Sequence, residues 1–146
     1  MSIPKIGLVA CNSGASNTGY LTGLAALEVV KKFGSEVGIC SLPALANNIS
    51  RQIVLVKKIK HLIVIDGCRN ECSRKILNTL GIKYEKYLNL EYDLQITKLG
   101  PFTTLNCSGE DVEKVSSAII EKIKEIDSIS LSNFVRPSCT HESART

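Results

Sequence analysis

The stretch KHLIVIDGCRNEC, residues 60–72, decides the fold of this chain. Its apolar centre is a continuous run of leucine, isoleucine and valine, typical of a strand buried on both faces of a parallel sheet. The run stops at Asp66, and Gly67 lets the chain turn sharply before Cys68. Cys72 follows four residues later, where a helix is expected to begin. This stretch therefore predicts a strand, a turn that carries two thiols, and a helix.

Strands and helices are expected to alternate along the rest of the chain. Strands are predicted at 3–10, 36–41, 61–66 and 84–91, and helices at 18–33, 50–60, 72–80 and 109–126. The sequence QIVLVKKI within 50–60 is also compatible with a strand. Residues 92–106 are ambiguous and are expected to form an excursion that ends in a short strand, FTTLN, at 102–106. Ser108 and Asp111 form the pattern of a capping box for the last helix.

This alternation predicts an α/β fold with three layers, in which helices cover both faces of a mostly parallel sheet of four or five strands. The arrangement is Rossmann-like, with right-handed crossovers. We expect one domain over residues 1–127, followed by a Ser-rich tail at 128–146 without periodicity. In such sheets, ligands bind beyond the carboxyl ends of the strands.

Composition narrows the classes of function. The chain has 146 residues and a net charge of +4, and its densest basic stretch, residues 57–61, has no aromatic residue within it. This argues against a nucleic-acid binder, which needs concentrated positive charge and stacking side chains. The apolar run near the start, IGLVA, is too short for a signal peptide or a membrane span. We therefore expect a cytoplasmic protein, in which the six cysteines stay reduced and serve metal ligation or thiol chemistry.

Four of these cysteines are predicted to meet at one edge of the sheet. Cys11 follows the first strand, Cys40 lies at the end of the second, and Cys68 lies two residues past the third. Cys72 opens the next helix, about one turn from Cys68. Because neighbouring parallel strands lie about 4.8 Å apart and end at the same edge, these thiols are expected to come together. Four reduced thiols make a tetrahedral site for zinc or an iron–sulfur cluster, although single cysteines are also common as small core residues.

The other candidate ligands carry less weight. Cys107 lies near a helix start and is expected to be a buried cysteine that at most approaches the same edge. Cys139 and His141 form a pair in the tail that we interpret as surface residues. His61 begins the third strand, at the opposite edge, and is excluded as a ligand. Asp66 is expected to hydrogen-bond to the backbone or to the ligands.

The loop CNSGASNTG, residues 11–19, allows a second interpretation. It follows a strand and opens a helix, which is the geometry of an anion cradle, but it lacks the lysine of a nucleotide-binding P-loop. Low-molecular-weight tyrosine phosphatases carry a catalytic cysteine at the place of Cys11 and an arginine six residues later, where this chain has Asn17. Without that arginine, phosphoryl transfer loses its main charge stabiliser. We favour a loop that caps the helix and shapes the site around Cys11.

The sequence resembles the DGC-domain proteins over roughly residues 5–125. The resemblance is carried by Asp66–Gly67–Cys68 with Cys72, by the turn from Cys11 to Gly14, and by Cys40 with Leu42–Pro43. It implies a zinc-binding protein with four cysteine ligands, which would be Cys11, Cys40, Cys68 and Cys72. It implies no reaction.

From the residues and the resemblance together we predict a metal-binding protein whose cofactor is Zn²⁺ and whose partner is the metal ion, with neither nucleic acid nor membrane involved. The alternatives are a redox or phosphatase-like enzyme that uses Cys11, and an iron–sulfur protein.

Overall fold

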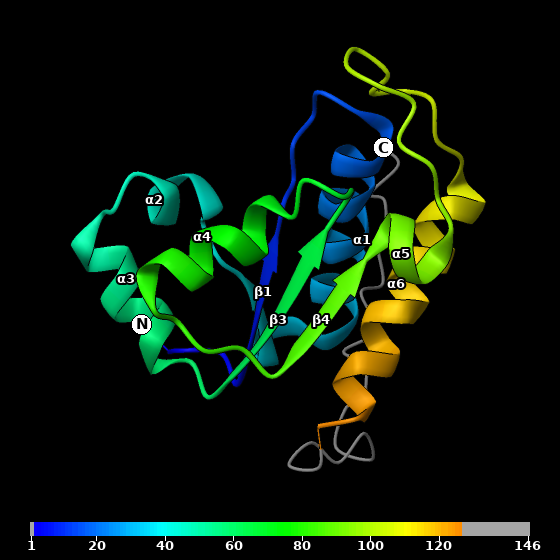
Figure 1. Cartoon of the computed structure of the whole chain (residues 1–146). Helices are drawn as coiled ribbons and strands as arrows, with labels where there is room; N and C mark the ends of the chain where they lie inside the picture. Colours follow the sequence, from blue (N-terminus) through cyan, green and yellow to red (C-terminus); the bar gives the residue numbers. More distant parts are fainter. Residues whose placement is uncertain (1, 127–146) are drawn as a thin grey trace, which may run out of the picture.

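The sheet has four parallel strands in the order β2-β1-β3-β4, as the computed structural model shows (Figure 1). The structure describes residues 2–126. The strands are β1 (Ile6–Ala10), β2 (Val37–Ile39), β3 (His61–Asp66) and β4 (Lys86–Asn89). The central pair, β1 and β3, is in register from Ile6 opposite His61 to Ala10 opposite Ile65. All five residues of β1 and all six of β3 are buried, as expected for central strands covered on both faces.

Helices cover both faces of this sheet and make the three predicted layers (Figure 1). The helices are α1 (Asn17–Phe33), α2 (Leu42–Ala46), α3 (Ser50–Lys58), α4 (Cys72–Leu80), α5 (Leu90–Leu94) and α6 (Gly109–Lys124), with a 3₁₀ turn, η1, at Gly34–Glu36. Helices α1 and α6 pack against each other and share one core cluster with Leu8 and Ile63. Helices α2, α3 and α4 cover the other face, where Val9 and Val64 form the second cluster.

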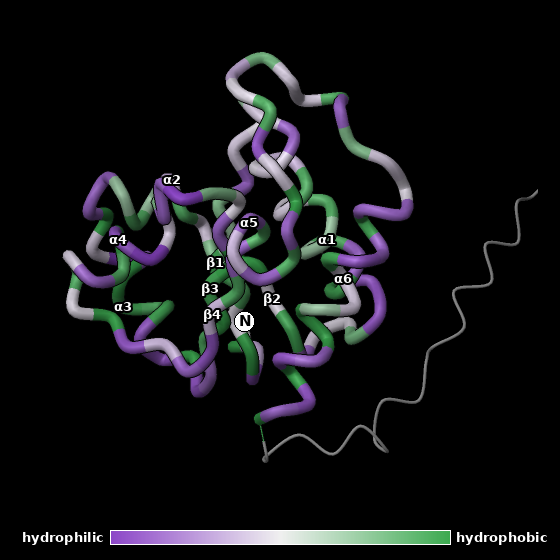
Figure 2. The backbone as a smooth tube through the Cα atoms, turned by 45° about the vertical axis from the view of Figure 1, so that its right-hand side comes forward, coloured by the Kyte–Doolittle hydropathy of each residue, from purple (hydrophilic) through white to green (hydrophobic). Residues whose placement is uncertain are grey.

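Local signals explain where the helices begin and end. Ser108 accepts a hydrogen bond from the Asp111 N–H and Asp111 accepts one from the Ser108 N–H, so the predicted capping box is confirmed. Gly34 and Gly81 follow α1 and α4 with positive φ angles of 59° and 66°, which favour glycine at a helix end. The tube in Figure 2 shows apolar residues gathered on the strands and on the helix sides that face them.

The excursion differs from its prediction. Residues 102–106 form turns rather than a strand, so the predicted fifth strand is wrong. Phe102 has a left-handed φ of 62°, and its N–H donates to Ala15 O at 2.7 Å instead of to a neighbouring strand. The segment is therefore held by the loop before α1, not by the sheet.

Several predicted boundaries also shift. The first strand begins at Ile6 rather than at residue 3, and the connection after β2 contains the short helix α2, which was not expected. The fourth strand ends at Asn89, because its side chain caps α5 by accepting from the N–H groups of Glu91 and Tyr92. The predicted tail, residues 128–146, lies outside the described residues. In residues 2–126, no helix is both long and apolar enough to cross a membrane.

Candidate metal centre at the carboxyl edge of the sheet

Cys11 is placed by the register of the two central strands. Its N–H donates to Ile65 O at 2.9 Å, which continues the β1–β3 ladder by one step and sets Cys11 beside Asp66. The chain then turns at Asn12, whose φ of 47° is left-handed and whose N–H donates to Thr22 Oγ1 at 2.8 Å. The loop after β1 is thus folded back onto the first turns of α1.

The turn formed by Asp66, Gly67 and Cys68, called the DGC turn below, packs against the same helix. A Cβ atom on Gly67 would lie 2.8–2.9 Å from the backbone of Thr18 and Gly19, closer than real Cβ atoms come. A Cβ on Gly19 would in turn lie 2.2 Å from Ser13 O. Two glycines therefore allow the loop at 11–16, the start of α1 and the DGC turn to meet backbone to backbone. This contact brings Cys68 to the side of the sheet edge where Cys11 lies.

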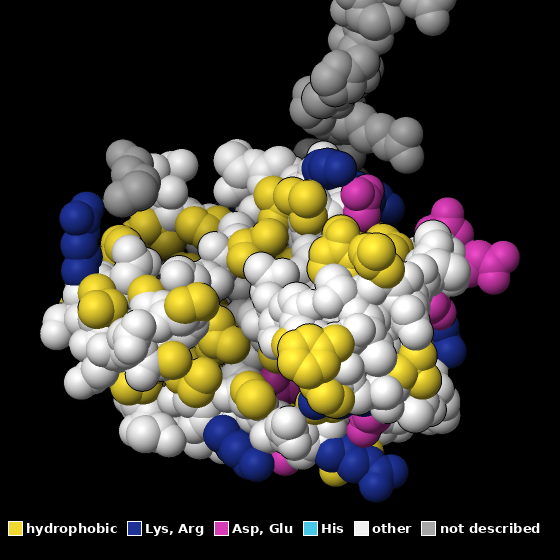
Figure 3. All heavy atoms as spheres, turned by 90° about the horizontal axis from the view of Figure 1, so that it is seen from above, with side chains coloured by type: hydrophobic (Ala, Val, Ile, Leu, Met, Phe, Trp, Pro, Cys, Tyr) yellow, Lys and Arg dark blue, Asp and Glu magenta, His cyan; other side chains and the backbone are white. Residues whose placement is uncertain are grey.

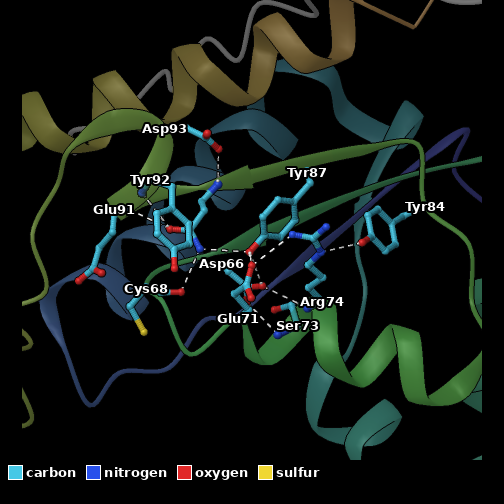
Figure 4. A network of polar contacts seen from close by, with 11 residues as sticks. Asp66, Cys68, Glu71, Ser73, Arg74, Tyr84, Tyr87, Glu91, Tyr92 and Asp93 are labelled. Atoms are coloured by element: carbon cyan, nitrogen blue, oxygen red, sulfur yellow. Dashed lines mark hydrogen bonds and ion pairs between the residues drawn. The ribbon is translucent and has the colours of Figure 1, made fainter.

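Asp66 is buried and caps helix α4. Its carboxylate accepts from the N–H groups of Ser73 at 2.8 Å and Arg74 at 3.1 Å, and the Tyr87 hydroxyl donates to it at 3.1 Å (Figure 4). A carboxylate at a helix N-terminus satisfies free N–H groups and interacts favourably with the helix dipole. The predicted hydrogen bonding of Asp66 to the backbone is confirmed, and it fixes the direction in which α4 leaves the turn.

Asn89, at the end of β4, holds the turn from the other side. Its side-chain amide donates to Cys68 O at 2.9 Å, and it is fully buried. The Glu71 N–H donates to the same Cys68 oxygen at 3.2 Å. Figure 4 shows Cys68 with its carbonyl turned toward this network and its sulfur turned away from it. The polar network therefore fixes the backbone of Cys68 and leaves the thiol outside it.

An arginine ties the same network to the edge of the sheet. Arg74 lies over the Tyr87 ring, 4.5 Å from its centroid, and donates to Tyr84 Oη at 3.0 Å and to Glu71 Oε1 at 3.2 Å. Neither Asn89 nor Arg74 was predicted from the sequence. An asparagine followed by acidic residues, NLEYD, is the one local signal that marks Asn89 as a helix cap.

Three of the four predicted cysteines share one electrostatic neighbourhood. The pKa of Cys11 is raised chiefly by burial and further by the negative charges of Asp66, Cys72 and Cys68, while the Ser13 N–H lowers it. Cys11 and Cys68 are partly exposed, and Cys72, the first residue of α4, is exposed. The structure thus brings thiols from the end of β1, the DGC turn and the start of α4 to one edge of the sheet.

Cys40 lies elsewhere. It is 9% exposed and belongs to the apolar cluster under α2, α3 and α4. Its Sγ is 3.0 Å from the point that a Cβ on Gly7 would occupy, near the beginning of β1. Burial alone raises the pKa of Cys40, to about 11, with no contribution from another thiol. The structure does not place Cys40 with the other three.

The remaining candidates are also separate from the three thiols. His61 is excluded as a metal ligand because it begins the third strand. It does lie at the start of β3, at the edge opposite the carboxyl edge, where it contacts Glu85. Cys107 is partly exposed, and its thiol lies 3.8 Å from Thr104 O. Cys139 and His141 fall outside the described residues.

All five cysteines within residues 2–126 are free thiols. In this part of the chain, no three Cys, His, Asp or Glu side chains already converge on one metal-sized point.

Because α5 extends to Leu94, the excursion comprises residues 95–107 in the structure. It lies over the start of α1. The Asn17 side chain donates to Thr97 O at 3.0 Å and accepts from the Leu99 N–H at 3.0 Å. Position 17, where a phosphatase would carry its arginine, is therefore an anchor for this segment. Between these contacts, Lys98 Nζ reaches to 3.7 Å from Cys68 Sγ.

Seen from above the carboxyl ends of the strands, the face is largely neutral, and most charged side chains lie at its rim (Figure 3).

The features that carry this geometry are the DGC turn, the loop after β1 and the helix that Asp66 caps. A family model described as the DGC domain matches residues 7–119. The chain belongs to the DGC-domain family. The matched range covers the four strands of the sheet, apart from Ile6 at the start of β1, and the four cysteines predicted as ligands. No curated protein and no solved structure matches the chain. For this DGC-domain protein, function is therefore argued from the site itself.

Proposed function

We propose that this DGC-domain protein binds a thiophilic metal ion, Zn²⁺, at the carboxyl edge of its sheet. The observation that carries the proposal is that Cys11, Cys68 and Cys72, from three separate elements, lie at one edge of the sheet, close enough for the charges of Cys68 and Cys72 to act on Cys11. Thiolates are common zinc ligands and predominate in closed structural sites. Their partial exposure leaves the side chains free to rotate toward one ion.

Electrostatics supports a cation at this place. Each thiolate of the group disfavours ionisation of Cys11, because like charges in proximity raise a pKa. A divalent cation reverses this effect and deprotonates its thiol ligands. Binding of a metal ion at this place would therefore relieve the mutual repulsion of the three thiolates.

The same observations weaken the alternative of a cysteine nucleophile. A reactive cysteine needs a lowered pKa, as in phosphatases and disulfide oxidoreductases, whereas that of Cys11 is raised. The residue at the position of a phosphatase arginine, Asn17, is buried and holds the excursion. We therefore place metal binding ahead of thiol catalysis. The reduced thiols that it requires fit a cytoplasmic location.

The fold does not depend on the metal for its core. Two apolar clusters fill the space on either side of the sheet. A domain of this size buries enough apolar surface to fold without a disulfide or a structural metal ion. The bound ion would therefore serve metal handling, sensing or chemistry, in contrast to small domains that are unfolded without zinc.

The test is metal analysis of the full chain, purified anaerobically without an affinity tag. We expect about one zinc per chain, and loss of most of it in Cys68→Ser. The matched control is Cys107→Ser, which changes another partly exposed free thiol outside the group and is expected to keep its metal. A wild-type protein that takes up no zinc, or a Cys68→Ser variant with unchanged stoichiometry, contradicts the proposal. Visible colour with bound iron would instead support the iron–sulfur alternative.

A further inference from the structure

The position of Cys40 bears on how many protein ligands the metal has. Gly7 has no side chain, and the space beside it is filled by Cys40 Sγ and by the side chains of Leu62 and Ile59, each 2.8–3.0 Å from where a Cβ would be. Cys40 is thus a packing partner of Gly7 in the apolar core between the sheet and α3.

The Cys40 sulfur is turned toward the beginning of β1, away from the carboxyl edge where the other thiols lie. The Cys40 backbone lies beside Val9, because its N–H donates to Leu8 O at 2.9 Å, but its Sγ packs against Gly7. Gly7 precedes Cys11 by four residues, a rise of about 13 Å along an extended chain. Ligand sulfurs lie about 2.3 Å from zinc, so two of them cannot be more than about 4.6 Å apart. Cys40 would have to swing out of its packed position and toward the carboxyl edge, whereas the exposed Cys72 only has to rotate.

The surroundings of Cys40 also favour a neutral thiol. A cavity of about 290 Å³ lies beside it, lined mainly by apolar residues that include Ile39, Val56 and Ile59. No charged side chain lines this cavity among the described residues. Turning Cys40 out of its packed position would leave unfilled space beside Gly7, which costs free energy in proportion to the volume created.

The carboxylates near the three thiols are already engaged and do not supply a fourth ligand. Asp66 accepts three hydrogen bonds and is 1% exposed. Glu71 is paired with Arg74, and Glu91 accepts from the Lys98 N–H at 2.9 Å and pairs with Arg69. The group that does approach is the Lys98 ammonium, 3.7 Å from Cys68 Sγ. A cation there attracts negative charge to the same place.

We propose that the metal of this protein is held by three thiolates, Cys11, Cys68 and Cys72, and that its fourth coordination position is open to a small thiol from solution, with Lys98 beside it. The inference rests on the metal binding proposed above and specifies its ligands. Three protein ligands and an exchangeable fourth position characterise zinc sites that react or transfer, whereas four protein ligands close a structural site. Cys40 is then a core residue and not a ligand.

The first experiment compares Cys40→Ala with Cys72→Ala in the full chain. The three-thiolate site predicts that Cys40→Ala keeps the wild-type zinc content, about one per chain, and that Cys72→Ala loses most of it. Loss of zinc in a folded Cys40→Ala protein overturns the inference and leaves the proposed metal binding standing. If the wild-type protein itself takes up no zinc, the proposed function fails and the inference fails with it.

The second experiment uses the wild-type chain and so does not depend on a folded variant. Cobalt replaces zinc, and a small thiol is added while the sulfur-to-cobalt charge-transfer band is recorded. An open position predicts that this band grows by about a third, the step from three thiolates to four. Gel filtration checks that the cobalt stays with the protein. A band that the added thiol leaves unchanged indicates a closed four-cysteine site and refutes the inference.

The role of Lys98 is tested in the same cobalt assay with Lys98→Met, which keeps the length of the side chain and removes its charge. If Lys98 favours a negative ligand at the fourth position, the variant needs several-fold more added thiol for half of the spectral change and keeps its cobalt content. Lys114→Met is the matched control, because Lys114 lies away from the thiols and donates to Leu94 O. An unchanged thiol requirement in Lys98→Met removes Lys98 from the proposal.

Discussion

The close contact between the DGC turn and α1 predicts the effect of adding a single carbon atom. In Gly67→Ala the new Cβ would lie 2.8 Å from the carbonyl carbon of Thr18 and 2.9 Å from Gly19 N. Carbon atoms in proteins prefer separations of about 3.5–4.0 Å, so the two segments must move apart by roughly 0.7 Å or more. The contacting atoms are backbone on both sides, and no side chain can rotate away to absorb the change.

The expected loss of stability follows from two opposing effects. Overpacking of this kind costs about 1–3 kcal/mol. Replacing glycine by alanine gains about 0.4–1 kcal/mol by restricting the unfolded chain, and Gly67 is not among the residues with positive φ, so this gain applies. We expect a net destabilisation of about 1–2 kcal/mol, which corresponds to a fall of about 2–8 °C in the melting temperature.

The assay is urea unfolding of the metal-free chain in the presence of a chelator, so that any bound ion does not enter the comparison. Gly14→Ala is the matched control: it lies in the neighbouring loop, has no heavy atom within 4 Å of its Cβ position and is expected to be as stable as wild type or slightly more stable. If Gly67→Ala and Gly14→Ala unfold at the same urea concentration, the turn does not pack as described and the argument for its glycine is refuted.

Two further predictions follow from side chains outside the turn. Asn17→Ala removes the side-chain hydrogen bonds to Thr97 O, to the Leu99 N–H and to the Thr103 hydroxyl, so the free energy of local opening of the excursion should fall by about 2 kcal/mol. Hydrogen exchange of the Leu99 amide should then be faster, and unchanged exchange would show that other contacts hold this segment. Burial raises the pKa of Cys40 from 9.0 to about 11, so the unfolded state loses this proton first as pH rises, and stability should decline by up to about 2.7 kcal/mol between pH 9 and 11. Cys40→Ala should lack this part of the decline in urea unfolding, and an equal decline in both proteins would contradict it.

The sequence was sufficient for the parallel sheet and for the position of three thiols. Local signals agree with the final fold in this chain. They are the buried run before Asp66, the glycines that end α1 and α4, and the capping box at Ser108. Cys11, Cys68 and Cys72 could be placed because a strand end or a helix start fixes where a backbone leaves the sheet.

The rest depends on contacts between distant parts of the chain. The direction of the Cys40 side chain is set by the empty space at Gly7, and spacing along the sequence does not reveal that space. The excursion could not be recognised because Asn17, 80 residues earlier, supplies its anchor. The predicted strand at 102–106 failed for the same reason, since the Phe102 N–H is already bonded to Ala15 O.

The lengths of the outer strands have a consequence for the behaviour of the protein at high concentration. Only three residues of β2 and four of β4 lie at the edges of the sheet, while the longer strands are central. An unpaired edge is the template on which another chain adds a strand and starts an aggregate. Edges this short offer few backbone groups for such pairing, so the native protein should resist edge-to-edge aggregation. The long apolar strand β3 can pair with another chain only during folding, before β1 and β4 have formed on either side of it.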